Sequence, residues 1–131
     1  MVNACDMLVI SSDLESRRTL TAILGDLGPD INVFSCSGVA QAAGVLSQKN
    51  IKLVLCQDRL SDGSFRDVLK TTRHAAPRPP VVVTTRMEDW DDYLEAVRLG
   101  AFDVIRYPYY PTDVEWTIHL AMRESASGTG R

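Results

Sequence analysis

Hydroxyl, amide and carboxylate side chains stand directly after, or at the end of, four short apolar runs of the sequence. They are Ser11, Ser12, Asp13, Gln57, Asp58, Thr84 and Tyr107. If the runs are parallel strands, these residues meet at the carboxyl edge of a sheet, where open α/β folds bind ligands. Such groups could orient a small polar ligand, and the carboxylates could act as nucleophiles.

The elements that must position these side chains follow from hydrophobic patterning. Five runs rich in Val, Ile and Leu alternate with five segments of helical period, which predicts a parallel sheet with helices on both faces. The predicted strands are residues 7–11, 32–36, 52–56, 80–84 and 103–106. Continuous apolar runs such as 53–56 and 81–83 are typical of central strands that are covered on both faces.

Capping patterns place the helices between these strands. Ser12 and Glu15 have the spacing of a capping box, as do Thr112 and Glu115, and they predict helices that begin at Ser12 and Thr112. The other predicted helices are residues 39–46, 65–72 and 89–99. The sequence thus predicts one domain over residues 1–124, and the small polar residues 125–131 predict a flexible tail.

Composition excludes several classes of function. The 131 residues carry a formal net charge of -3 without a broad basic patch, so we expect no direct binding of nucleic acid. No apolar run approaches the ~20 residues that cross a bilayer, and no signal peptide is visible, so we expect a soluble, cytoplasmic protein. Cys5, Cys36 and Cys56 are interpreted as small buried residues, and His74 and His119 as solvated rather than metal-binding.

Three segments resemble the receiver domain of two-component response regulators, the CheY-like family. They are residues 7–13 (MLVISSD), 53–63 (LVLCQDRLSDG) and 100–109 (GAFDVIRYPY). The resemblance extends from Met7 to about Arg123 and implies the flavodoxin-like (βα)5 receiver fold. It also implies a place in bacterial phosphorelay signalling.

The residues expected at the receiver's phosphorylation site are mostly replaced. In that family two acids hold magnesium, an aspartate accepts phosphate, a Ser or Thr ends the fourth strand, and a lysine precedes a cis proline. The corresponding residues here are Ser11, Ser12, Gln57, Thr84, and Tyr107 before Pro108. The amide of Gln57 cannot attack phosphorus, and neutral ligands suit magnesium poorly. The resemblance therefore implies a pseudo-receiver that is not an enzyme, has no cofactor and acts through protein contacts.

Two other functions remain open at this stage. Asp13 and Asp58 each lie one residue beyond the expected acids, and Asp62 lies in the next loop, so a displaced acid such as Asp58 could still accept phosphate. Alternatively, Gln57, Ser11, Ser12 and Tyr107 could orient a small ligand at the carboxyl edge.

The last helix carries more apolar residues than one core-facing side needs. Val114, Ile118 and Ala121 repeat at core spacing, whereas Trp116 and Leu120 fall on another side. Together with Tyr93 and Val97 of the preceding helix, they predict a surface for a protein partner or a homodimer. The residue of the fifth strand that is aromatic in many receivers is Val104 here.

Overall fold

The computed structural model describes residues 5–75, 77–86 and 90–127. Its main sheet has five parallel strands in the order β2-β1-β3-β6-β7. The strands are β1 (Cys5–Ile10), β2 (Ile31–Cys36), β3 (Ile51–Gln57), β6 (Val81–Thr85) and β7 (Asp103–Arg106). The predicted fold class is confirmed, and each predicted strand boundary lies within two residues of the observed one.

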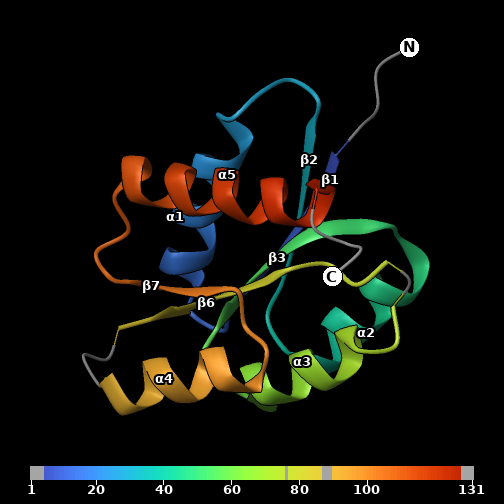
Figure 1. The fold of residues 1–131 in the computed structure, drawn as a ribbon, viewed down its shortest axis with the longest axis vertical. Coiled ribbons are helices and arrows are strands. Elements are labelled where there is room, and N and C mark those ends of the chain that lie inside the picture. The colour runs from blue at the N-terminus through green and yellow to red at the C-terminus, as the bar shows by residue number, and fades with distance from the viewer. Residues whose placement is uncertain (1–4, 76, 87–89, 128–131) are drawn as a thin grey trace.

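Helices cover both faces of this sheet. They are α1 (Leu14–Gly25), α2 (Val39–Gln48), α3 (Phe65–Thr72), α4 (Trp90–Leu99) and α5 (Pro111–Ser127). Figure 1 shows α1 and α5 on one face and α2, α3 and α4 on the other. Three layers result, with the strands in the middle.

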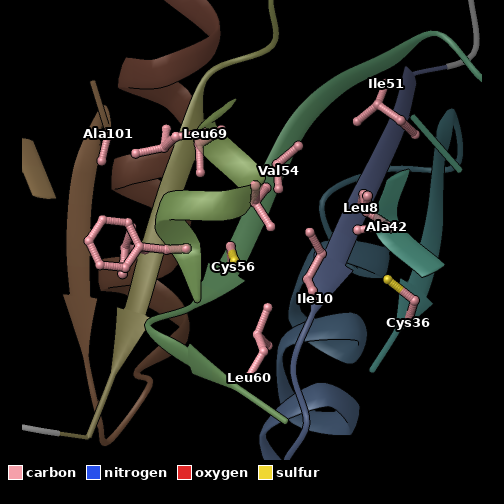
Figure 2. Packing of buried hydrophobic residues seen from close by; sticks show 14 of the residues in the cluster. Leu8, Ile10, Cys36, Ala42, Ile51, Val54, Cys56, Leu60, Leu69 and Ala101 are labelled. Carbon is pink, nitrogen blue, oxygen red and sulfur yellow. The ribbon is translucent and has the colours of Figure 1, made fainter. Parts of the chain in front are cut away.

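Strand alternation divides the core into two halves. Leu53 and Leu55 of β3 pack towards α1 and α5, whereas Val54 and Cys56 pack towards α2 and α3. Figure 2 shows Val54 and Cys56 in the second half together with side chains from β1. Because successive side chains of a strand point to opposite faces, a wholly apolar β3 fills both halves.

Both predicted capping boxes are wrong. Asp13, not Ser12, is the N-cap of α1, because its carboxylate accepts the amide hydrogen of Ser16. The helix α5 begins at Pro111, so Thr112 lies inside its first turn. Proline is favoured at a first helical position because its missing N–H has no intrahelical acceptor there.

Three other details differ from the sequence-based expectations. A two-stranded hairpin, β4 (Arg59–Leu60) with β5 (Gly63–Ser64), was not predicted. The helix α5 extends to Ser127, beyond the predicted domain boundary at residue 124, and residues 128–131 lie outside the described residues. Cys36 and Cys56 are buried as expected, but Cys5 is only half-buried.

In the described ranges, no helix is long and apolar enough to cross a membrane.

Candidate functional site

The site forms around Gln57, the last residue of β3, at the carboxyl edge of the sheet. The register pairs Gln57 with Thr84 on β6, and β1 ends beside it on the other flank. The amide oxygen of Gln57 accepts a hydrogen bond from Ser11 Oγ at 2.8 Å and another from the backbone N–H of Ser12 at 2.9 Å. Ser11 is fully buried. The amide oxygen of Gln57, the hydroxyl of Ser11 and the backbone N–H of Ser12 therefore find their hydrogen-bond partners within this group.

Ser12 connects this group to two neighbouring loops. Its hydroxyl donates to the carbonyl of Ser37 at 2.6 Å and accepts from the backbone N–H of Ser61 at 2.9 Å. Ser37 precedes α2, and Ser61 lies in the turn between β4 and β5. The loops after β1, β2 and β3 are thus joined at one hydroxyl.

Asp62 makes a second connection between the hairpin and α2. Its two carboxylate oxygens accept the backbone N–H groups of Val39 at 2.7 Å and Ala40 at 3.1 Å, and these bonds lower the pKa of Asp62. A Cβ atom on Gly38 would lie 2.6 Å from Asp62 Oδ1, so this approach requires glycine at position 38. Asp62 acts as a helix cap from a distant loop.

Asp13 uses its carboxylate to hold α1 and Arg86. Ser16 Oγ donates to Asp13 Oδ2 at 2.6 Å, and Arg86 lies 3.2 Å from the same oxygen. The Ser16 hydroxyl is the largest cause of the lowered pKa of Asp13. The guanidinium of Arg86 lies 4.3 Å from the centre of the Tyr107 ring. Asp13 therefore stabilises the start of α1.

Asp58 lies apart from the Ser11–Gln57 group. Thr85 Oγ1 donates to Asp58 Oδ2 at 3.0 Å, and the two residues line a cavity between β6, β7 and the helices α3 and α4. The neighbouring Gln57 instead contacts the end of β1. The structure therefore places Asp58 and Gln57 in different environments, although they are adjacent in sequence.

Thr84 is buried and is joined to a residue that sequence reasoning missed. The hydroxyl of Tyr109 is hydrogen-bonded to the side chains of Thr84 and Ser16, while burial raises the pKa of Tyr109. The ring of Tyr107 packs edge-on against Tyr109 at 5.5 Å. The peptide bond between Tyr107 and Pro108 is cis, as the resemblance implies. The feature of the sequence that could have identified Tyr109 is its position directly after Tyr107 and Pro108.

The residues at this edge do not fit a magnesium ion. Magnesium prefers anionic oxygen ligands in octahedral order, whereas Ser11 Oγ and the amide oxygen of Gln57 are uncharged and bonded to each other. The two carboxylates that follow these residues in sequence are engaged elsewhere, that of Asp13 by Ser16 and Arg86 and that of Asp58 by Thr85. In the part of the chain that the structure describes, no three His, Cys, Asp or Glu side chains group as metal ligands.

The predicted partner residues differ in exposure. Trp116 is 66% exposed and Val97 is 41% exposed, but Tyr93 and Leu120 are half-buried. Leu120 is therefore less available to a partner than its spacing predicts. Further exposed apolar side chains in α4 and in the segment before α5 are Leu94, Leu99, Tyr107 and Tyr110.

Comparisons with known proteins agree with this fold. The response regulator protein PilR of Pseudomonas aeruginosa is 29% identical over 101 residues, which cover 77% of this chain and 22% of PilR. The transcriptional regulatory protein ZraR of Escherichia coli K12 is 26% identical over 122 residues, which cover 93% of this chain and 27% of ZraR. The chain thus spans about a quarter of the length of these curated relatives. No family model matches the chain.

Solved receiver structures superpose on most of the chain. The receiver domain of a LuxO repressor protein from Vibrio parahaemolyticus gives a TM-score of 0.84 at 15% identity and covers 94% of this chain and 93% of its own. A receiver domain protein from Clostridium thermocellum gives 0.83 at 21% identity and covers 93% and 97%. The chain therefore has the receiver fold, and its sequence is similar to those of two-component response regulators.

Proposed function

We propose that this domain is a phosphorylation-independent receiver that acts through protein contacts. The observation that carries the proposal is the closed group of Gln57, Ser11 and Ser12, in which one amide oxygen accepts two hydrogen bonds. In a receiver that accepts phosphate, the residue at this place must be a nucleophile. Here it is a neutral acceptor that stabilises the loops after β1 and β3. On this proposal the domain has no catalytic activity and requires no magnesium.

The surface that we assign to the partner lies on α4, α5 and the segment that joins β7 to α5. Its exposed members include Val97, Tyr110 and Trp116. A tryptophan that is two-thirds exposed is a typical anchor of a protein interface. The occupant is a protein surface, either a second copy of the chain or another signalling protein, and we expect neither nucleic acid nor a membrane there.

The two alternative functions have less support from the contacts. Phosphorylation of Asp58 would require its carboxylate to lie beside Ser11 and Ser12, which occupy the positions of the family's magnesium-binding acids. Instead, the carboxylate of Asp58 accepts a hydrogen bond from Thr85. A small ligand at the carboxyl edge would have to replace the hydrogen bonds that Ser11, Ser12 and Gln57 already form with one another.

Intact-mass spectrometry after incubation with acetyl phosphate and magnesium tests the proposal. We expect no phosphoryl adduct on the wild-type domain or on Asp58→Asn. A positive control restores the family's residues with Ser11→Asp, Ser12→Asp, Gln57→Asp and Tyr107→Lys, and circular dichroism checks that it folds. An adduct on the wild type that disappears in Asp58→Asn would overturn the proposal and establish the displaced acid as the acceptor.

A further inference from the structure

A cavity separate from the Gln57 group opens on the face of the sheet that carries α3 and α4. Its volume of about 70 Å³ is roughly five times the space that one water molecule requires. Its apolar lining comes from four side chains on three sides, namely Phe65, Val83, Ala96 and Val104. Val83 and Ala96 are almost completely buried, so the cavity reaches the core.

Arginines dominate the polar lining of this cavity. Arg59, Arg66 and Arg106 line it, together with Asp58, Thr85 and Tyr93. Arg66 pairs with Glu95 and lies over the ring of Phe65. Among the described lining residues, three arginines stand against the single carboxylate of Asp58, although the formal net charge of the chain is -3.

The arginines are not equally engaged. Among the residues that the structure describes, Arg59 forms no ion pair, whereas Arg66 is held by Glu95. Arg59, on β4, is also exposed, so its side chain is accessible to a solute. The planar guanidinium suits a carboxylate, because it donates two parallel hydrogen bonds to both oxygens.

We propose that this cavity binds a small organic anion with a flat or branched apolar body. The carboxylate of the ligand contacts Arg59 at the entrance, and its apolar body lies on Val83, Ala96 and Val104. A valine at position 104 leaves this room, because a larger side chain there would occupy the cavity. The cavity and the Gln57 group share no lining residue, so the proposal does not depend on the hydrogen bonds of that group. Asp58 does line the cavity, so a phosphoryl group on Asp58 would add negative charge there and weaken binding of an anion.

Benzoate is a suitable probe, because it combines a carboxylate with a flat apolar ring. The full chain, carrying ¹³C-labelled methyl groups, is titrated with benzoate and separately with benzyl alcohol, a neutral molecule of similar shape. We expect saturable shifts of the Val83, Ala96 and Val104 methyl signals with a Kd on the order of 1 mM, as is usual for so small a ligand. Val82, which faces the other half of the core, serves as the internal control.

Two variants and the neutral probe decide between outcomes. Benzyl alcohol should bind about tenfold more weakly, because it lacks the charge-assisted bonds to arginine. Arg59→Gln should weaken benzoate by a similar factor without changing benzyl alcohol, and Val104→Phe should abolish both. Linear, non-saturating shifts, or equal affinity for the two probes, would overturn the proposal.

Discussion

Replacing Gln57 by methionine should destabilise the domain by about 1–2 kcal/mol. Methionine has nearly the same length but removes the oxygen that accepts hydrogen bonds from Ser11 Oγ at 2.8 Å and from Ser12 N at 2.9 Å. Two such bonds contribute about 1–3 kcal/mol together. The loss should fall in the lower half of this range, because Ser11 Oγ already lies 3.2 Å from the carbonyl of Asp13 and Ser12 is open to water.

Urea denaturation measures this change. We expect a lower midpoint and an unchanged slope of free energy against urea, because the surface exposed on unfolding is the same. Gln48→Met is the matched control, since Gln48 is exposed in the last turn of α2, and it should change stability by less than about 0.5 kcal/mol. The double variant with Ser11→Ala should show a coupling of about 1 kcal/mol. If Gln57→Met is no less stable than Gln48→Met, Gln57 does not hold the carboxyl edge together.

Four further outcomes follow from the same contacts. Trp116→Lys should weaken self-association or partner binding in analytical ultracentrifugation without lowering the thermal midpoint. The control Leu14→Lys, which also replaces an exposed apolar residue by lysine but at the start of α1, should leave association unchanged. The reverse pattern would show that α5 is not part of the interface. The pKa of Asp13 lies below its unfolded value of about 4, so its contribution is present above that pH and disappears as pH falls through the folded pKa. The urea midpoints of wild type and Asp13→Asn should therefore converge as the pH is lowered from neutral into the acid range below the unfolded pKa, and a constant gap would contradict this. Tyr109→Phe should cost about 1 kcal/mol by removing the hydroxyl bonded to Thr84 and Ser16, measurable by urea denaturation, and a neutral effect would show that water or a rearranged hydroxyl replaces it. Magnesium at about 10 mM should move the thermal midpoint by less than about 1 °C, and a larger rise would demonstrate a binding site.

The sequence predicted the sheet well because the strands are the most apolar segments. The apolar run of β3 must be buried on both faces. The alternation of side chains along the strand then determines which of them face each half of the core. Helix starts were harder, because Ser12 and Asp13 can both cap a helix and only tertiary contacts select between them. The hydroxyl of Ser12 is hydrogen-bonded to Ser37 and Ser61 instead, so Asp13 caps α1.

The sequence predicted which residues form the site but not which hydrogen bonds they make. Sequence placed Ser11, Ser12 and Gln57 at one edge, since strand ends define that edge. It could not show that Asp62 would reach across to α2, because this contact depends on the β4–β5 hairpin and on the space left by Gly38. Nor could it separate Asp58 from Gln57, because the direction of a side chain at a strand end depends on how the chain leaves the strand.

The hydrogen-bonded group at the end of β3 contains only side chains that do not ionise in the ordinary range of cellular pH. Serine hydroxyls and a glutamine amide keep the same charge across this range, so on the proposed function the hydrogen bonds of the Gln57 group need no proton, metal ion or phosphate to form. On this proposal, the fraction of the domain in complex is set by mass action alone. A cell that uses this domain as we propose would regulate it by how much of it, and of its partner, is made.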